Sequence, residues 1–428
     1  MSNISVIGLW HLGCVTAACL ASKHHVIGYD PSLKVIEGLK AGKPPLFEPG
    51  LAEAMSDASK RGALEFSSDF KDAVGRSGII YIAFDTPVDK DDLVDLSPVE
   101  NALENAIQHM RDGQMVIISS QVPVGTCRRL HAKISGAGKK IGFCYSPENL
   151  RLGSAIEAFM KPERIVFGVS DPSLRSRLED VFEGVSGERI FMDLESAEMV
   201  KHAMNSYLAT MISFSGEISN LCEKTGANAV SVMDALKKEK RVSPYAPISP
   251  GLGFGGGTLA RDLQALREIG GQKGIPTLLL DAAFNSNRER MGYVRQRLLS
   301  ALGALSGKTV AFFGLTYKPG TDTLRRSLAL DVIGSLGQSG VKVRAYDPAI
   351  KSQIETHPQV QVCASPEEAA DGADAIVITT AWEQFKSLDY PSLGRRMRQP
   401  VIIDARNMLS PEKIGKEMRY FGVGVTYG

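Results

Sequence analysis

The sequence predicts an α/β protein with two doubly wound parallel sheets joined by a long central helix. Three observations support this fold class. Short apolar runs alternate with helical stretches, one pattern of strand, glycine turn, helix and strand occurs twice, and a long helical run separates the two copies. Such alternation is typical of parallel sheets covered by helices. A chain of 428 residues is also too long for one ordinary core, so two or three domains are expected.

The first domain is predicted over residues 1–195, where strands alternate with helices. The opening strand is a short apolar run that ends in glycine, and the second strand closes on Asp30. A buried helix is expected between them, at Cys14–Ala21. The expected strands are Ile4–Gly8, His25–Tyr29, Ile79–Phe84, Met115–Ser119 and Ile141–Tyr145.

A long helical run is predicted over Ser196–Lys224, where apolar residues recur every three or four positions and Gly216 is the only glycine. A helix of about 29 residues would be about 43 Å long, which is long for a globular protein. We therefore expect a spine between domains that can also serve as a dimer surface. The central domain is predicted over residues 196–300.

The third part of the chain repeats the first. The segments KTVAFFGLTYKPG (308–320) and VKVRAYDPA (341–349) follow the same order of elements as ISVIGLWHLG and HHVIGYDPS, and both copies close on Tyr-Asp-Pro. A repeat of this size predicts two related nucleotide-binding domains with one ligand each, the second over residues 301–428. Later strands of its sheet are expected at Ala375–Thr379 and Val401–Asp404.

The first turn has the glycine spacing of a Rossmann-like, dinucleotide-binding domain. It reads Gly8-Leu9-Trp10-His11-Leu12-Gly13, so Trp10 replaces the middle glycine that usually lets the backbone approach a pyrophosphate. Asp30 ends the second strand, where a carboxylate would bind a ribose 2′-hydroxyl and repel a 2′-phosphate. NAD is therefore expected rather than NADP. A chance turn beside a strand-end aspartate is the alternative.

Two polar residues of the long helix are candidates for chemistry. Lys201 and Asn205 are four residues apart and hence on one face. An amine beside an amide can stabilise an alkoxide or bind a phosphate. By spacing alone, a solvated helix face explains the same pair equally well.

Two loops follow predicted strands, at Phe84–Pro87 and Ser119–Thr126. Parallel sheets bind ligands at the carboxyl ends of their strands. By spacing alone these segments are equally compatible with ordinary loops.

A glycine-rich loop, Gly251–Thr258, has five glycines in its first seven residues and is followed by Arg261 and Asp262. Such a loop exposes backbone amides to an anionic ligand. A flexible linker is the alternative, but linkers rarely contain Pro250, Phe254 and an immediate helix start.

Composition excludes several function classes. A net charge of +1 gives no basic surplus for nucleic acid or an anionic membrane. The six cysteines show no metal-ligand spacing and read as thiols of a reducing cytosol. We found no leader sequence and no apolar stretch near the roughly 20 residues that span a bilayer, so a cytoplasmic protein is expected.

In their order along the chain, these features resemble the UDP-glucose/GDP-mannose dehydrogenase family, and the resemblance covers essentially the whole sequence. As an ordered series the match is highly specific, although each piece alone is weak. The matching signatures are Leu46–Leu51, Val122–Thr126, Ser146–Arg151, the Lys201/Asn205 pair, Gly253–Gly256 with Asp262, and Lys318–Asp322 with Arg325.

Members of this family oxidise the C6 alcohol of a nucleotide sugar to a carboxylate with two NAD. The resemblance implies that Lys201 and Asn205 act on the reacting oxygen and that Asp262 assists through a water. Lys318 and Arg325 would reach the site from a C-terminal domain that holds the nucleotide. A homodimer paired through the central helix is also implied.

The turn and the resemblance together define the candidate site. The catalytic candidates are Lys201, Asn205, Asp262, Glu148 and Thr258. The cofactor-binding candidates are Gly8, Trp10, His11, Leu12, Gly13, Asp30, Lys34, Thr86, Ser120, Gln121, Arg261 and Arg325. The substrate-binding candidates are Glu148, Asn149, Leu150, Arg151, Lys201, Asn205, Tyr245, Gly253, Phe254, Gly255 and Lys318. No metal site is expected.

The sequence departs from the family at three positions. Thr258 stands where the family has the cysteine nucleophile of the second oxidation, and a hydroxyl is a far weaker nucleophile without an adjacent base. Leu152 replaces a glutamate near the thioester-hydrolysis step, and Gln121 replaces a threonine. The groups for the first hydride transfer are kept, whereas those for the thioester route are replaced together.

The leading hypothesis is therefore an NAD-dependent dehydrogenase of a UDP-hexose, such as UDP-glucose or an N-acetyl derivative, that stops at the two-electron carbonyl product. One alternative is full four-electron oxidation through a hydrated aldehyde, which needs no thiol. Another is a catalytically silent protein that binds NAD and the UDP-sugar. The hexose is left open, and uridine is preferred over guanosine by analogy alone.

Overall fold

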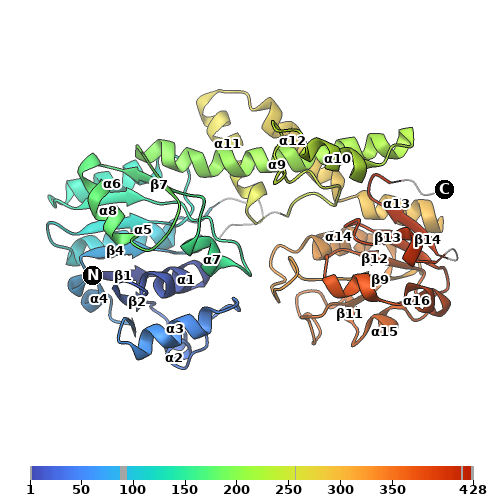
Figure 1. Ribbon diagram of the computed structural model, residues 1–428, viewed down its shortest axis with the longest axis horizontal. Coiled ribbons are helices and arrows are strands. Elements are labelled where there is room, and N and C mark those ends of the chain that lie inside the picture. The colour runs from blue at the N-terminus through green and yellow to red at the C-terminus, as the bar shows by residue number, and fades with distance from the viewer. Residues whose placement is uncertain (1, 87–93, 256, 416–417, 426–428) are drawn as a thin grey trace. The chain divides into compact units, whose positions relative to one another are not determined.

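The computed structural model describes residues 2–86, 94–255, 257–415 and 418–425. The chain forms two compact units, Met1–His202 and Ala203–Gly428. Each is built on one predominantly parallel sheet flanked by helices (Figure 1). The predicted architecture, two Rossmann-like domains with a long central helix, is confirmed.

The sheet of the first unit has eight strands. They are β1 (Asn3–Ile7), β2 (His25–Tyr29), β3 (Leu64–Ser67), β4 (Ile79–Ile82), β5 (Met115–Ile118), β6 (Gly142–Tyr145), β7 (Arg164–Val169) and β8 (Glu188–Met192). Their order is β3-β2-β1-β4-β5-β6-β7-β8. The first six are parallel in the order of a dinucleotide-binding domain, and β7 turns antiparallel to β6.

The helices of the first unit connect these strands. They are α1 (His11–Leu20), α2 (Leu33–Lys40), α3 (Leu51–Lys60), α4 (Phe70–Arg76), α5 (Ser97–His109), α6 (Thr126–Gly136), α7 (Ala155–Met160), α8 (Arg175–Val181) and the short 3-10 helix η1 (Pro172–Leu174). In α1 every residue after His11 is buried. This burial fits the helix that carries the dinucleotide turn.

The central helix α9 spans Leu194–Thr225, 32 residues, slightly longer than the predicted run. It begins in the first unit and continues in the second, since the division falls between His202 and Ala203. Glu198, which is fully buried, accepts hydrogen bonds from the backbone amides of Gly125 (2.6 Å) and Cys127 (2.7 Å) at the start of α6. This carboxylate therefore fixes the beginning of α9 to the first sheet domain.

The sheet of the second unit repeats the topology of the first. Its strands are β9 (Thr309–Phe313), β10 (Lys342–Tyr346), β11 (Val360–Val362), β12 (Ala375–Ile378), β13 (Val401–Asp404) and β14 (Arg419–Gly422). All six are parallel, in the order β11-β10-β9-β12-β13-β14. Counted from β9, this is the order of the first six strands of the chain, so the internal repeat is confirmed.

Helices make up the rest of the second unit. They are α10 (Ala229–Lys237), α11 (Leu259–Lys273), α12 (Leu278–Arg290), α13 (Tyr293–Leu302), α14 (Leu328–Leu336), α15 (Pro366–Ala370) and α16 (Tyr390–Arg396), with the 3-10 helices η2 (Gly337–Ser339), η3 (Glu383–Ser387) and η4 (Pro411–Lys413). Only α14 to α16 belong to the sheet repeat. The helices α10 to α13 lie between β8 and β9 along the sequence, and no strand occurs among them in the described residues.

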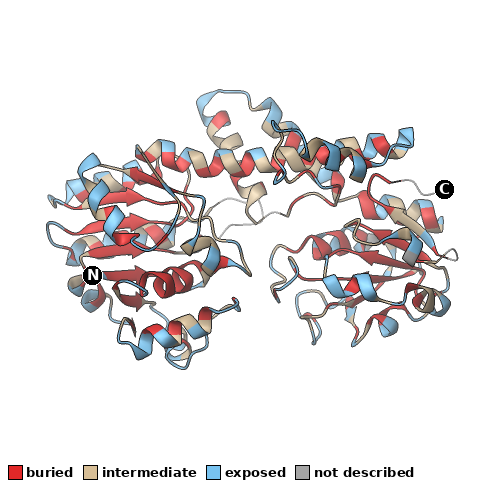
Figure 2. Cartoon of the chain, in the orientation of Figure 1, coloured by how far each residue is buried: buried red, intermediate tan, exposed pale blue. Residues whose placement is uncertain are grey.

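Burial explains why the strands read as apolar runs. β4 (IIYI) and β5 (MVII) are buried at every position, as expected for central strands with helices on both faces. Figure 2 shows both sheets as buried and most helices as buried on one side only. The predicted strands are confirmed, several of them ending one or two residues earlier than expected.

Two negative findings concern the described residues. None of the helices there is both long enough and apolar enough to cross a lipid bilayer. No group of three or more histidine, cysteine, aspartate or glutamate side chains among them is arranged to hold a metal ion.

Candidate active site

The dinucleotide turn connects β1 to α1 and depends on two of its glycines. Gly8 has φ +94°, and a Cβ there would lie 2.7 Å from the Phe84 ring. A Cβ at Gly13 would overlap the Gly8 carbonyl oxygen. Trp10 caps α1 with φ −99°, which any L-residue adopts, and its side chain is 44% exposed. The turn therefore forms with tryptophan at its middle position.

Asp30 lies beside this turn at the end of β2. Its carboxylate accepts hydrogen bonds from the backbone amides of Leu9 (3.1 Å) and Ser32 (2.9 Å), and the residue is half-buried. A strand-end carboxylate held in this way fits the ribose diol of NAD. Lys34, also a cofactor candidate, is exposed in α2.

Asp85 is a residue whose role sequence reasoning missed. Its carboxylate accepts a hydrogen bond from the backbone amide of Leu12 (3.3 Å), in the first turn of α1. That helix terminus is where a dinucleotide pyrophosphate is expected to bind. The sequence could have indicated this role, because an acidic residue shortly after a central strand can reach the neighbouring helix terminus.

The two loops at the carboxyl ends of β4 and β5 touch each other. The Thr86 hydroxyl donates to the Gln121 carbonyl oxygen (3.1 Å). The neighbouring Ser120 is fully buried, and its hydroxyl has no hydrogen-bond partner among the described residues. Buried hydroxyls are rarely left without a hydrogen-bond partner, so the unpaired Ser120 hydroxyl is consistent with a loop that binds a polar ligand. Pro87, which the sequence assigned to the first loop, lies outside the described residues.

Glu48 joins the dinucleotide turn to the residues that follow the predicted substrate segment, Glu148–Arg151. Its fully buried carboxylate lies 2.8 Å from His11 Nε2 at the start of α1. It also accepts hydrogen bonds from the amides of Gly153 and Ala155, each at 2.8 Å. The sequence marked Glu48 as part of a family signature, but gave no reason for it.

The substrate segment contacts the first catalytic candidate. The Lys201 ammonium donates to the Glu148 carbonyl oxygen (2.6 Å) and lies 3.5 Å from Glu148 Oε1. Lys201 is only 5% exposed. A small cavity of about 50 Å³ is bordered here by Leu12, Ser119, Ser146, Pro147, Glu148, Asn149 and Leu150, with other residues. Arg151, by contrast, is exposed.

A second polar pair forms in the other unit. The Asn205 side-chain amide donates to Asp262 Oδ2, and both side chains are buried. Asp262 lies in the first turn of α11, which Thr258 caps. The Thr258 hydroxyl makes no capping hydrogen bond to the helix, and the residue is half-buried. Arg261 is half-buried as well.

The glycines before α11 allow close packing of the loop. Gly253 has φ +94°, and a Cβ there would overlap the side-chain oxygen of Asn287. A Cβ at Gly255 would lie 2.9 Å from the Arg326 carbonyl oxygen. Sequence reasoning gave these glycines the role of exposing amides, whereas the structure adds contacts that no side chain could fit. Gly256 lies outside the described residues.

In the second sheet domain, the acid that follows the second strand is engaged within the protein. Asp347, the repeat's counterpart of Asp30, is fully buried. Its Oδ2 accepts hydrogen bonds from the amide of Leu315 (2.7 Å), the hydroxyl of Thr316 (3.0 Å) and the indole of Trp382 (3.1 Å). Since Asp347 is buried and these groups occupy its Oδ2, this carboxylate is not available to a ribose diol as Asp30 is.

The remaining substrate and cofactor candidates lie on loops or in the core. Lys318 is half-buried and Arg325 exposed, both between β9 and α14. Tyr245 is 92% exposed, and Phe254 is buried in a small helical core.

The six cysteines lie in the interior of the protein. All six are unpaired and buried. Burial raises the pKa of Cys14 and Cys19 to about 12, and it raises the pKa of Cys144 further. A buried thiol of this kind is inert as a nucleophile at neutral pH.

The fold and these contacts define a class of protein: a two-domain oxidoreductase that uses a nicotinamide dinucleotide. Sequence comparison gives the family. The NAD binding domain of the UDP-glucose/GDP-mannose dehydrogenase family matches residues 2–186, its central domain matches residues 195–289, and its UDP binding domain matches residues 311–411. The chain belongs to this family, so the expected NAD-dependent oxidoreductase of nucleotide sugars is confirmed.

Individual relatives agree over their full lengths. UDP-glucose 6-dehydrogenase TuaD of Bacillus subtilis is 34% identical over 420 residues, covering 97% of this chain and 91% of the relative. A UDP-glucose dehydrogenase of Pyrobaculum islandicum matches with a TM-score of 0.91 and 34% identity over 100% of this chain and 98% of that one. A UDP-D-ManNAc dehydrogenase of Pyrococcus horikoshii matches with a TM-score of 0.88 and 27% identity, covering 99% of both.

Proposed function

We propose that this protein oxidises the sugar alcohol of a UDP-hexose, at C6, and stops at the two-electron carbonyl product. UDP-glucose is the first candidate because two of the relatives described above carry it in their names. The observation that carries the proposal is the combination at α11. The Asn205–Asp262 pair is intact, and Thr258, which we place at the position of the family's nucleophile, caps the same helix.

The groups for one hydride transfer are present in this chain. Lys201 and Asn205 are one helical turn apart in α9, and we assign both to the reacting oxygen. An amide has two hydrogens, so Asn205 can donate one to Asp262 and the other to the developing alkoxide. Lys201 is held in place by Glu148. NAD, when bound, accepts the hydride, and the alcohol proton leaves to a base or to water.

The groups that the family uses for the second oxidation are exchanged for Thr258 and Leu152, and we assign their role to no other residue. A threonine hydroxyl attacks a carbonyl only when an adjacent base removes its proton. The Thr258 hydroxyl makes no capping hydrogen bond to α11, and we assign no adjacent base to it. Leu152, at the position of the family's second glutamate, cannot polarise a water. The aldehyde therefore leaves the site instead of being captured.

Substrate recognition divides among three regions in this proposal. Residues 1–195 bind NAD, residues 196–300 carry the central helix and the glycine loop, and residues 301–428 bind the UDP group. Glu148 to Arg151 contact the sugar and diphosphate, Lys318 contacts the nucleotide sugar, and Arg325 contacts the cofactor. Exposed Tyr245 is the least constrained of the substrate candidates.

The test is to incubate the protein with NAD and hydroxylamine, in turn with UDP-glucose, UDP-N-acetylglucosamine and UDP-N-acetylmannosamine. We expect NADH formation with one of them and recovery of the sugar as an oxime, since hydroxylamine traps a released carbonyl. Recovery of a uronate instead would favour four-electron oxidation. Calorimetric binding of UDP-sugar and NAD without NADH would favour a silent binding protein.

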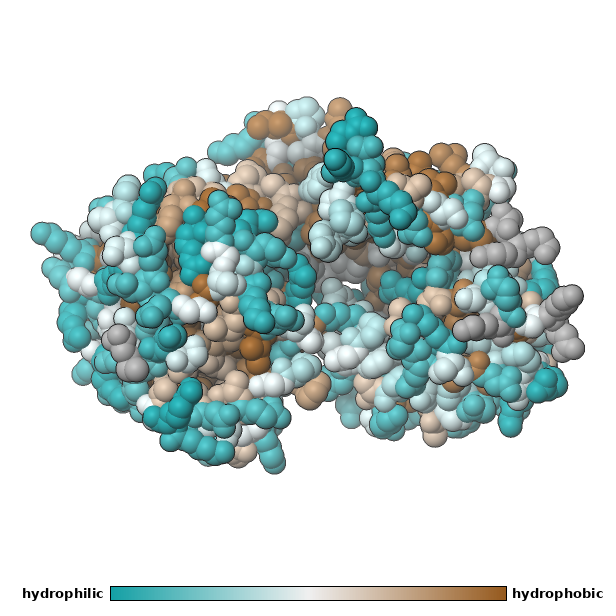
Figure 3. Space-filling view, viewed as in Figure 1, coloured by the Kyte–Doolittle hydropathy of each residue, from teal (hydrophilic) through white to brown (hydrophobic). Residues whose placement is uncertain are grey.

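We also propose a homodimer paired through α9. Tyr207, Phe214 and Leu221 repeat every seven residues and hence share one face of the helix. They are 64%, 48% and 60% exposed, and large apolar side chains gathered on a surface mark an interface. Figure 3 shows hydrophobic residues at the surface over the central helices of the second unit.

The oligomeric state tests this interface. Replacing Phe214 and Leu221 by glutamate should halve the mass measured by light scattering, while Leu33→Glu, an exposed apolar position of α2, should leave it unchanged. A wild-type monomer would contradict the dimer.

We propose that the protein works in the cytoplasm. Its six cysteines are all unpaired, which fits a reducing compartment. Fractionation of the source cells tests this, and recovery of the protein outside the cytoplasmic fraction would contradict it.

A further inference from the structure

The glycine-rich loop is anchored in two different apolar cores. Leu252 is fully buried in the core of the C-terminal sheet domain, beside Val294 and Leu298. Phe254, two residues later, packs in the small core formed by α9, α11 and α12. The chain must therefore turn sharply at Gly253, which has φ +94°. Beyond Phe254 the loop leads directly to Thr258 and the start of α11.

A single side chain of α12 holds the backbone at this turn. The side-chain oxygen of Asn287 accepts a hydrogen bond from the Phe254 amide (2.9 Å), and its amino group donates to the Phe254 carbonyl oxygen (3.0 Å). Both polar groups of Phe254 are thus satisfied by one amide. The absence of a Cβ at Gly253 is what lets Asn287 come this close.

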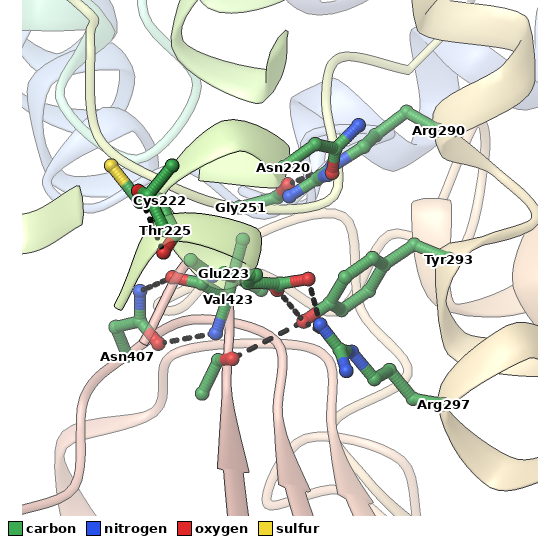
Figure 4. Close-up of polar contacts among 12 residues, drawn as sticks. Asn220, Cys222, Glu223, Thr225, Gly251, Arg290, Tyr293, Arg297, Asn407 and Val423 are labelled. Carbon is green, nitrogen blue, oxygen red and sulfur yellow. Dashed lines mark hydrogen bonds and ion pairs between the residues drawn. The ribbon is translucent and has the colours of Figure 1, made fainter. Parts of the chain in front are cut away.

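Arg290, one turn further along α12, holds the beginning of the loop. Its Nε donates to the Gly251 carbonyl oxygen (2.8 Å), and its Nη1 donates to the Asn220 side chain on α9. The guanidinium is 4.4 Å from the centre of the Tyr293 ring, and the residue is 7% exposed. Figure 4 shows Arg290 beside Gly251 and Asn220, with the Tyr293 ring nearby.

Tyr293 connects this group to the last strand of the second sheet. Its hydroxyl donates to Glu223 Oε1 (2.8 Å) and approaches the Gly422 carbonyl oxygen at 3.2 Å. The same oxygen, Glu223 Oε1, also accepts a hydrogen bond from the Gly424 amide (2.9 Å). The second carboxylate oxygen, Glu223 Oε2, pairs with Arg297. The start of α13 is therefore fixed to α9 and to the end of β14, and α12 is fixed to α9 through Arg290 and Asn220 (Figure 4).

At Gly253, between the two apolar anchors Leu252 and Phe254, the loop backbone is held by hydrogen bonds. A polar cavity of about 150 Å³ lies here, bordered by Ser213, Gly216, Glu217, Asn220, Gly253, Asn287, Arg290 and Tyr293, with other residues. A loop that borders a cavity gains little from dispersion contacts on that side. Its geometry there depends on directional bonds to Asn287 and Arg290.

We propose that Asn287 and Arg290 are positioning residues for the reaction. By fixing Gly251 to Phe254 at two points, they determine where the following residues, Thr258 and Asp262, present their groups to the sugar. We assign them no contact with substrate or cofactor, so that they act through the loop. This inference rests on the proposed function, since it assumes that the loop borders the reacting carbon.

The test compares Asn287→Ala with Asn285→Ala, an exposed asparagine on the same helix. For Asn287→Ala we expect faster amide hydrogen exchange in peptides covering residues 251–258, with unchanged exchange in β9 and β12. We expect kcat to fall about tenfold or more, because a loop displaced by 1 Å misplaces reacting groups. The UDP affinity measured by calorimetry should stay as in the wild type. Asn285→Ala should change none of these.

Arg290→Lys provides a second variant, because lysine keeps one donor to Gly251 but loses the bond to Asn220. Arg290→Lys should lower kcat, and Arg290→Gln should lower kcat more than Arg290→Lys does. A merely structural role predicts a lower melting temperature for Asn287→Ala with unchanged kcat per folded molecule, and this result would overturn the proposal. So would unchanged exchange of the loop.

The two proposals fail in distinguishable ways. If the wild type forms no NADH with any UDP-hexose, the proposed function fails. The positioning role is then read from calorimetry with UDP-glucose and UDP, since Asn287→Ala should remove any gain in affinity that the glucose provides. An equal gain in wild type and variant would overturn the role in that case too.

Discussion

The side-chain amide of Asn205 donates a hydrogen bond to the carboxylate of Asp262, and Asp262 is fully buried. This bond connects the long helix α9 to the first turn of α11. It fixes the orientation of the Asn205 amide, because the hydrogen that bonds Asp262 determines where the second one points. The pair is therefore the best-defined part of the proposed oxyanion site.

Asp262→Ala should lower kcat by about 100-fold, because removing a preorganised partner at a developing oxyanion costs this much. Asn205 would keep its side chain but lose the bond that orients it. Steady-state kinetics with NAD and the accepted UDP-hexose measure the effect, and Asp234→Ala, an exposed aspartate of α10, is the control. A kcat within twofold of the wild type would contradict the assignment.

Thr258→Cys should restore part of the second oxidation. A thiol at the start of α11 can add to the aldehyde and be oxidised as a thiohemiacetal, and Leu152→Glu would return the carboxylate that the family places near thioester hydrolysis. We expect the NADH formed per sugar to rise above one in Thr258→Cys and to approach two in the double variant. Leu152→Glu alone should leave it at one. If Thr258→Cys changes the rate of NADH formation but not the NADH formed per sugar, the missing thiol does not explain the two-electron product.

Asp85→Asn should tighten NAD binding. The Asp85 carboxylate lies at the N-terminus of α1, where the cofactor's pyrophosphate needs positive potential. Removing the negative charge while keeping a hydrogen-bond acceptor should lower the NAD Kd about two- to fivefold. Fluorescence titration at low ionic strength measures this, with the exposed Asp57→Asn as control. Weaker binding would show that Asp85 supports the turn more than it repels the cofactor.

His24 should make the first unit less stable in mild acid. Burial lowers the pKa of His24, whose Nε2 bonds the Val181 carbonyl oxygen (2.9 Å). As the pH falls through the ordinary histidine pKa of about 6.5, the unfolded chain binds a proton before the folded one does. The free energy of unfolding therefore decreases through that window.

The His24→Gln variant should lose less stability than the wild type over the same pH range. Melting temperatures between pH 7.5 and pH 5 should converge for the two proteins as the pH falls, whereas His109→Gln, an exposed position, should keep a constant offset. If the melting temperatures of the wild type and His24→Gln fall in parallel with pH, His24 is not the cause of the acid destabilisation.

Much of the fold could be predicted from the sequence because central strands are buried on both faces. β4 and β5 appear in the sequence as apolar runs between polar segments. The Tyr-Asp-Pro that begins at the last residue of β2 and of β10 marks the internal repeat. Edge strands gave a weaker signal. In β8 no residue is buried, so its sequence does not differ enough from a loop to be recognised.

The site residues stay predictions. Helical spacing places Lys201 and Asn205 on one face, the family resemblance assigns them to the reacting oxygen, and Asp30 was chosen for its place after a strand. Contacts between distant segments could not be predicted, since nothing local in Asn287 indicates that it holds Phe254, 33 positions earlier. The engagement of Asp347 also depends on Trp382, which sequence alone does not bring near.

Whether one oxidation or two takes place is decided by the number of NADH formed per UDP-glucose consumed by the wild-type protein, with mass spectrometry of the sugar product. If UDP-glucose is the substrate, this account predicts one NADH and a carbonyl product, because Thr258 and Leu152 leave the second oxidation without its nucleophile and its carboxylate. Two NADH and a uronate would contradict it, and would require a route to the acid that uses no cysteine.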